Sequence, residues 1–369
     1  MRMQGEGLQY QQLLAETSHQ AKTKMSKIIA VVGATGTQGG SVAARFSKIP
    51  GWRTRAITRS PDSDAARKLA SQGIEVVQAD LDDVESLKSA FSGASAIFGV
   101  TDFWQFVQKE STQKLAQAKG ISWNEACYLQ EVQQGKNIID AAAHVVQHGT
   151  LERMVLSTLS DARRASGAKY TWVYHFDSKA HFANYLKDRA LHDATYQALS
   201  DNTSYVQIGN YLDNWKKNPI LAPRKGDDGV VVFRSISPDA SEGEGLHRTP
   251  FVHPPTDTGL FVEALVLKAA PQTTLLGACA LMSLSEYVKL WGDINGVKTK
   301  IQILTADEVD LTWPGGFGLE VGQTACYVRE FGWDGGEGAI LPEQAGVNVS
   351  ELTDVKSYIE TTDWSSILG

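Results

Sequence analysis

Short apolar runs alternate with amphipathic stretches along the first part of the chain. The apolar runs lie at 27–32, 53–58, 74–78, 94–101, 153–158 and 203–208. Helical spacing of apolar positions is found in the stretches 41–47, 65–72, 84–91, 125–147 and 175–199. Because parallel strands are joined by crossovers that are usually helices, this order predicts an α/β fold, with one parallel sheet covered on both faces.

The first apolar run ends in a glycine-rich turn, Gly33-Ala34-Thr35-Gly36-Thr37-Gln38-Gly39-Gly40. Gly33 and Gly36 allow the backbone to bend and approach a ligand, and Gly39 allows the next helix to lie against the strand. Free amides at the helix start can bind an anion. The Gly-x-x-Gly-x-x-Gly spacing differs from the usual dinucleotide fingerprint, and a turn without a ligand is the alternative. The strand–turn–helix context favours a dinucleotide site on a doubly wound sheet of the Rossmann type.

The second and third apolar runs end in residues that can contact a dinucleotide. Arg59 offers a charged planar fork to the 2′-phosphate of NADP, where an acidic residue would favour NAD. The alternative is a solvent-facing arginine that opens a loop. Asp80 could accept a bond from the adenine amino group and Leu81 could cover its ring. An acidic helix cap is the competing interpretation of Asp80.

Polar and aromatic residues follow the later apolar runs. The segment 102–124 carries four aromatic residues, which form either core or a pocket wall. The next segment, His175-Phe176-Asp177-Ser178-Lys179, begins the stretch 175–199, and Asp177 is a candidate cap for that helix.

Composition narrows the functional class. The chain has 369 residues and a formal net charge of −7, so nothing in its overall charge supports direct nucleic-acid binding. Its three cysteines are scattered, and neither they nor the histidines have a disulfide or metal-site spacing. No apolar stretch is long enough to span a membrane, and the N-terminus lacks a signal-peptide profile. We therefore expect a soluble cytoplasmic protein.

Three regions are expected along the chain. Residues 1–24 are polar and glutamine-rich and are predicted to be a flexible tail, with Met25 as an alternative start. Residues 25–215 are predicted to form the dinucleotide-binding domain. Residues 216–369 are predicted to form a smaller mixed region that covers the substrate and partly folds back on that domain. Its glycine-rich segments 313–322 and 331–338 are either loops at the substrate mouth or surface turns.

Several of these motifs together resemble the NmrA-like family of atypical short-chain dehydrogenases and reductases. They are the glycine turn, Arg59, Val100-Thr101-Asp102-Phe103-Trp104, His175-Phe176-Asp177-Ser178-Lys179 and Tyr211-Leu212-Asp213-Asn214. The resemblance implies an NADP site with Asp80 and Leu81 near the adenine. The residues implied at the phosphates are Gly33, Thr35, Gly36, Thr37, Gln38, Gly39 and Arg59. Those implied at the nicotinamide half are Thr101, Lys179, Tyr211, Leu212 and Asn214.

The resemblance leaves two functions open, because the family includes oxidoreductases and non-catalytic redox sensors that modulate transcription factors or other partners. No tyrosine of this chain has a lysine four residues later, so the usual catalytic pair is missing. His175 precedes Lys179 by one helical turn and could replace the phenol, or it could be structural. The leading hypothesis is an NADPH-dependent oxidoreductase acting on a small hydrophobic carbonyl or conjugated substrate. The alternative is an NADP(H)-sensing regulator with a protein partner, either cytoplasmic or nuclear.

Overall fold

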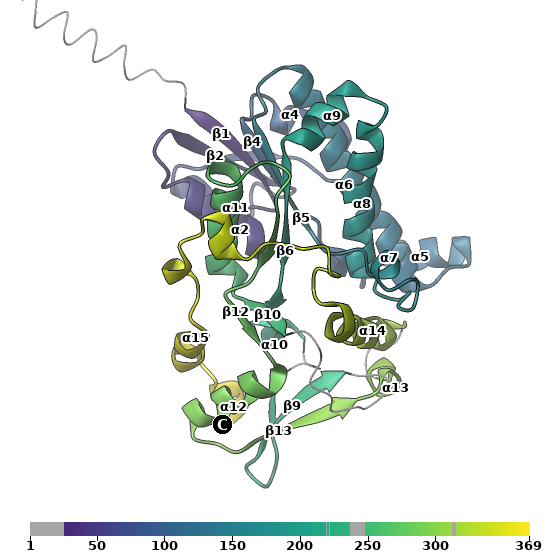
Figure 1. The fold of residues 1–369 in the computed structure, drawn as a ribbon, viewed down its shortest axis with the longest axis vertical. Helices are drawn as coiled ribbons and strands as arrows, with labels where there is room; N and C mark the ends of the chain where they lie inside the picture. The colour runs from purple at the N-terminus through teal and green to yellow at the C-terminus, as the bar shows by residue number, and fades with distance from the viewer. Residues whose placement is uncertain (1–25, 219, 221, 237–247, 312–314) are drawn as a thin grey trace, which may run out of the picture.

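The computed structural model describes residues 26–218, 220, 222–236, 248–311 and 315–369 (Figure 1). The tail predicted for residues 1–24 and the alternative start at Met25 lie outside the described residues.

The main sheet has seven parallel strands in the order β11-β6-β5-β4-β1-β2-β3. Its strands are β1 (Lys27–Val32), β2 (Trp52–Thr58), β3 (Glu75–Gln78), β4 (Ala96–Gly99), β5 (Arg153–Thr158), β6 (Thr203–Ile208) and β11 (Thr274–Gly277). The strand order changes direction between β1 and β4, which opens a crevice at their carboxyl ends. The predicted doubly wound parallel sheet is confirmed.

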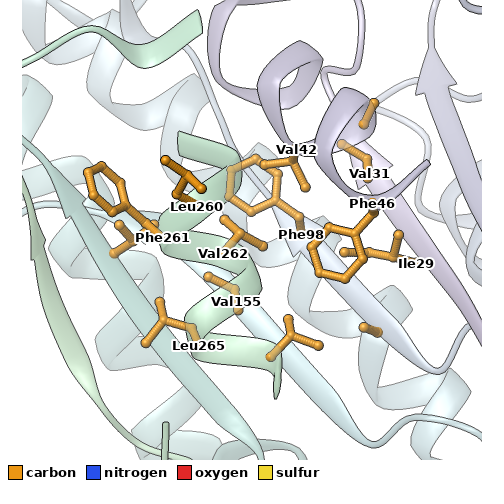
Figure 2. Packing of buried hydrophobic residues seen from close by; sticks show 14 of the residues in the cluster. Ile29, Val31, Val42, Phe46, Phe98, Val155, Leu260, Phe261, Val262 and Leu265 are labelled. Carbon is orange, nitrogen blue, oxygen red and sulfur yellow. The ribbon is translucent and has the colours of Figure 1, made fainter. Parts of the chain in front are cut away.

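Helices cover both faces of this sheet because the strand side chains alternate between two apolar cores. Ile29 and Val31 of β1 pack into one core, whereas Ala30 and Val32 pack into the other. Figure 2 shows the first core, where side chains of α2 (Thr37–Phe46) and α11 (Pro254–Leu267) meet the strands. The second core is covered by α4 (Val84–Phe91), α6 (Trp123–Gln147), α8 (Tyr174–Ala190) and α9 (Ala194–Asp201).

Two helices differ from their predicted bounds. Helix α2 begins at Thr37, inside the glycine turn, rather than at residue 41. The stretch 175–199 forms two helices, because α8 ends at Ala190. Asp193 then starts α9 by accepting a bond from the backbone amide of Thr195 at 2.8 Å. The remaining elements of this half are α3 (Asp64–Ser71), the 3-10 helix η1 (Phe103–Phe106), α5 (Glu110–Lys119) and α7 (Ala162–Ala165).

The second half of the chain adds two small sheets beyond the carboxyl ends of the main strands (Figure 1). One has the order β12-β10-β7 and the other the order β13-β9-β8. Their strands are β7 (Asn210–Tyr211), β8 (Arg224–Lys225), β9 (Val231–Ile236), β10 (Thr249–Val252), β12 (Ala280–Met282) and β13 (Thr299–Leu304). This half also returns to the main sheet, because β11 pairs with β6 and α11 packs on α2.

Helices complete the second half, and several of them pack around a third apolar core that contains Phe233 and Trp291. They are α10 (Asn214–Lys217), α12 (Leu284–Asn295), α13 (Ala306–Asp310), α14 (Phe317–Phe331), α15 (Val355–Thr361) and α16 (Ser365–Leu368), with 3-10 helices η2 (Pro342–Ala345) and η3 (Val349–Glu351). Within the described ranges, no helix has both the length and the apolar composition needed to cross a bilayer.

Helix α14 corrects the prediction for the glycine-rich segment 313–322. Residues 313 and 314 lie outside the described residues, and the rest of the segment is a turn followed by the first turns of α14 rather than a loop. The glycines serve close packing there. A Cβ at Gly318 would lie 2.2 Å from the backbone oxygen of Ala306 in α13.

Candidate functional site

The glycine turn after β1 has the shape that a dinucleotide phosphate site requires. Gly33 has a φ of +63°, and its oxygen accepts a bond from the Gly36 amide at 2.8 Å. A Cβ at Gly39 would lie 2.3 Å from the Gly33 oxygen, so only glycine lets α2 start this close to the strand. Gly36 is the N-cap residue of α2, and the helix presents its first amides at this point.

A single cleft with a volume of about 2390 Å³ opens at the carboxyl ends of the main strands. It contains nearly every residue that the sequence assigned to the site. Those that line it are Gly33, Thr35, Gly36, Thr37, Gln38, Gly39, Arg59, Leu81, Thr101, His175, Lys179, Tyr211, Leu212 and Asn214. The structure thus brings together side chains from five strand ends and from the start of α8.

Asp80 is the predicted residue that does not line this cleft. Its carboxylate accepts a bond from the Asp82 amide at 3.0 Å and so stabilises the turn after β3. The helix cap that competed with the adenine interpretation is a different residue, because Asp83 caps α4 through the Glu85 and Ser86 amides. Asp80 thus stabilises this turn, and its contact with an adenine ring stays a prediction.

Arg59 lies exposed at the end of β2, where it lines the cleft. Its backbone oxygen accepts a bond from Gln78 at 3.2 Å. Among the described residues, no ion pair or hydrogen bond engages its guanidinium group. The charge is therefore available to a ligand.

Lys179 forms a buried ion pair that the sequence did not reveal. Its ammonium nitrogen lies 2.5 Å from Oε1 of Glu131, a fully buried residue in the middle of α6. The same oxygen accepts a bond from Thr101 at 2.7 Å, and the other carboxylate oxygen accepts one from Ser178. Glu131 thereby fixes Lys179 beside Thr101 at the cleft. The sequence around Glu131 contains no pattern that indicates an ion pair with Lys179.

His175 is held by a second buried carboxylate. Its backbone amide and its Nδ1 both lie within hydrogen-bond distance of Oε1 of Glu320, at 2.8 and 2.7 Å. The other oxygen of Glu320 accepts a bond from Asn124 at 2.6 Å. Glu320 belongs to α14, the helix that the sequence missed, so His175 joins the two halves of the chain. The ring of Trp104 lies 5.1 Å from the imidazole.

Tyr211 meets the glycine turn across the cleft. Its hydroxyl accepts a hydrogen bond from the side-chain amide nitrogen of Gln38 at 2.7 Å. Burial raises the pKa of Tyr211 to about 12, so the phenol stays protonated at neutral pH. Two segments that are far apart in sequence, the start of α2 and β7, are thus connected at the predicted cofactor site.

The aromatic segment 102–124 divides between the two roles predicted for it. Phe106 is buried in a small apolar core, Phe103 belongs to that core and also lines the cleft, and Trp104 is 39% exposed and lines the cleft. Much of the segment is ordered, because η1 and α5 fall within it. Asp177 does not cap its own helix. It accepts a bond from the Arg163 amide of α7 at 3.0 Å, and burial raises its pKa to about 7.

The described residues form no metal centre. No group of three or more His, Cys, Asp or Glu residues in the described ranges is arranged to hold a metal ion. Cys127, Cys279 and Cys326 are not joined by disulfide bonds.

Sequence and structure comparisons place this chain among known proteins. The NmrA-like family model matches residues 25–359. The NmrA-like oxidoreductase FrzB of Cladobotryum sp is 30% identical over 288 residues, which cover 75% of this chain and 76% of FrzB. The transcriptional regulator NmrA in complex with NADP has a TM-score of 0.65 at 16% identity, covering 93% of this chain and 97% of NmrA.

A second solved structure has the same fold. The quinone oxidoreductase QOR2 of Escherichia coli, complexed with NADPH, has a TM-score of 0.59 at 17% identity, covering 90% of this chain and 98% of QOR2. At these identities the two structures establish the shared fold. The family match along nearly the whole chain and the likeness to FrzB establish more: the chain is a member of the NmrA-like family.

Proposed function

We propose that this chain binds NADP(H) in its cleft and acts as an oxidoreductase on a small hydrophobic carbonyl or conjugated substrate. The observation that carries the proposal is the meeting, in one cleft, of the glycine turn, the unpaired Arg59 and the Lys179–His175 face of α8. The NADP complex of NmrA and the NADPH complex of QOR2 support the choice of cofactor.

The residues of the cleft fit NADP(H). A Cβ at Gly39 would fill the space where the backbone turns, and the first amides of α2 offer donors to a pyrophosphate. Arg59 supplies a guanidinium that no described residue engages and that a 2′-phosphate could bind. The hydrogen bond between Gln38 and Tyr211 connects the start of α2 to β7 at the edge of this cleft.

When bound, NADPH supplies a hydride from its nicotinamide ring. The chain's own residues would orient the substrate and manage its charge. Lys179 brings a positive charge to the cleft, where negative charge develops on a carbonyl oxygen during reduction. Glu131, which also accepts a bond from Thr101, holds that lysine in position.

His175 is the candidate proton donor. With Nδ1 directed to Glu320, the other ring nitrogen, Nε2, is the one left to exchange a proton with a substrate. The aromatic rings of Phe103 and Trp104 flank the imidazole and limit access of water to it.

One observation favours the alternative, an NADP(H)-binding regulator without turnover. The Glu131 carboxylate lies against Lys179 and offsets the positive charge that would stabilise an oxyanion. The absent tyrosine has the same implication. A regulator requires only that NADP(H) binding alters the surface presented to a protein partner.

An assay of purified full-length protein with NADPH and a broad panel of carbonyl and quinone substrates separates these functions. Consumption of NADPH that is lost in Lys179→Ala supports the oxidoreductase. Tight NADPH binding without consumption on any substrate supports the regulator.

A further inference from the structure

The cleft carries a positive charge that the whole chain does not. The formal net charge of the chain is −7, yet eight Lys or Arg residues and three Asp or Glu residues are among the described residues that line the cleft. Arg59 and Lys179 belong to the proposed cofactor region. The other six come from the second half of the chain and are Arg224, Arg234, Lys289, Lys298, Lys300 and Arg329.

Several of these cations already have partners. Lys289 pairs with Asp293 at 2.6 Å, and Lys300 lies 4.0 Å from Asp228. Arg329 contacts the Cys326 thiol. Lys289 and Lys300 therefore have carboxylate partners within the protein itself.

Arg234 differs from them because it is partly buried and unpaired. It lies on β9, the middle strand of its sheet, and its Nε is buried without a hydrogen-bond partner. Among the described residues, no carboxylate lies within ion-pair distance of its guanidinium. Removing a charge from water without a partner costs free energy, and a bound anion would offset that cost.

Arg224 lies beside it on the same face of the sheet. Arg224 pairs with Val232 across the antiparallel strands β8 and β9, so Arg224 and Arg234 are diagonal neighbours whose side chains leave the same face. Burial and the Arg224 charge together lower the pKa of Arg234, which remains protonated at neutral pH. Two neighbouring cations to which the described residues bring no counter-charge form a site suited to an anion.

The shape of the two side chains indicates which anionic group they bind. The aromatic residue Phe233 does not belong to this site, because it packs in the third apolar core and so leaves β9 on the opposite face from Arg234. Two guanidinium forks match a planar carboxylate through paired hydrogen bonds.

We propose that Arg234 and Arg224 bind the carboxylate of the substrate, so that the substrate class is an organic acid that also carries a reducible group. The identity of the reducible group rests on the proposed function. The carboxylate site is independent of the proposed function, because Arg234 and Arg224 can bind an acid without turnover.

Calorimetric titration of the full chain, with and without NADPH, tests this site with three probes. They are 4-phenylbutanoate, its methyl ester and 4-phenylbutyl phosphate. We expect wild type to bind the acid at least about tenfold more tightly than the ester, as for a charge-assisted hydrogen bond. Arg234→Met should remove the preference, and Arg234→Lys should retain part of it. Thermal melting confirms that each variant is folded.

Lys289→Met is the matched control, because Lys289 lines the same cleft but is paired with Asp293. It should leave the preference for the acid unchanged. Equal binding of acid and ester by wild type, or an unchanged preference in Arg234→Met, would overturn the proposal, as would tighter binding of the phosphate. Failure of the oxidoreductase function would look different: no NADPH would be consumed with any carbonyl, while the preference for the acid persisted.

Discussion

The ammonium group of Lys179 lies 2.5 Å from a carboxylate oxygen of Glu131, a residue with no exposed surface. Glu131 also accepts bonds from Thr101 and Ser178, so three donors converge on one buried carboxylate. The position of Lys179 at the cleft is therefore set by α6, a helix that does not itself carry any of the predicted site residues.

Breaking this pair should destabilise the fold strongly. Glu131→Gln leaves the Lys179 charge without its counter-charge in a buried place, which should lower the free energy of unfolding by about 3 kcal/mol. Glu152→Gln is the control, because Glu152 pairs with Lys27 on the surface and should cost less than about 1 kcal/mol. Urea denaturation measures both. Small and equal losses would mean that the buried pair does not hold this region.

Arg59 should determine the choice of cofactor. Because its guanidinium lies at the cleft beyond the end of β2, Arg59→Ala should weaken NADPH binding by about tenfold or more and leave NADH binding almost unchanged. Arg53→Ala is the control, since Arg53 lies on the same strand but does not line the cleft. Calorimetric titration gives the affinities. Equal affinity of wild type for NADPH and NADH would contradict the assignment.

His175 should affect turnover and not cofactor binding. If its imidazole donates the proton, His175→Phe should reduce turnover by a factor of about 10² or more while NADPH affinity stays the same. His181→Phe is the control on the same helix, because His181 contacts Tyr128 and does not line the cleft. Steady-state kinetics and calorimetry measure the two effects. Full activity of His175→Phe would make this histidine structural.

Asp177 should make stability depend on pH. Burial raises its pKa to about 7 in the folded chain, whereas in the unfolded chain it ionises near pH 4. Between these values the folded state holds a proton that the unfolded state releases, so stability falls as pH rises. The slope is about 1.4 kcal/mol per pH unit.

The variant Asp177→Asn cannot ionise and should not show this contribution. Its free energy of unfolding relative to wild type should increase from pH 5 to pH 7 and stay constant above pH 8. Urea denaturation of both proteins at four pH values in this range measures the difference. Parallel pH profiles would show that Asp177 ionises in the folded chain as it does in the unfolded one.

Much of the fold could be predicted because buried parallel strands are short, apolar and separated by helices. The runs at 27–32, 153–158 and 203–208 coincide with β1, β5 and β6. Helix α14 could not be predicted in the same way. Its glycines at 318 and 322 suggested a loop, whereas Gly318 is required by close contact with Ala306 of α13.

The site residues at strand ends could be predicted because ligands of such sheets bind there, and Arg59 and Thr101 do line one cleft. The two carboxylates that hold the site could not. Glu131 lies in a stretch of helix where polar and apolar residues are mixed, and Glu320 lies in the glycine-rich segment. Their roles depend on contacts that are distant in sequence, which no local pattern contains.

Transfer of deuterium from NADPH labelled on the nicotinamide C4 tests the central claim most directly. The measurement is mass spectrometry of products formed by the full-length protein from the panel of carbonyl and quinone substrates, with Lys179→Ala alongside. We predict that wild type forms at least one product that carries deuterium. A hydroquinone product exchanges its deuterium with water, so for a quinone substrate the prediction is that the labelled NADPH is consumed. Lys179→Ala should form no reduced product. Tight NADPH binding by wild type, with no reduced product and no loss of label on any substrate, would contradict the oxidoreductase function.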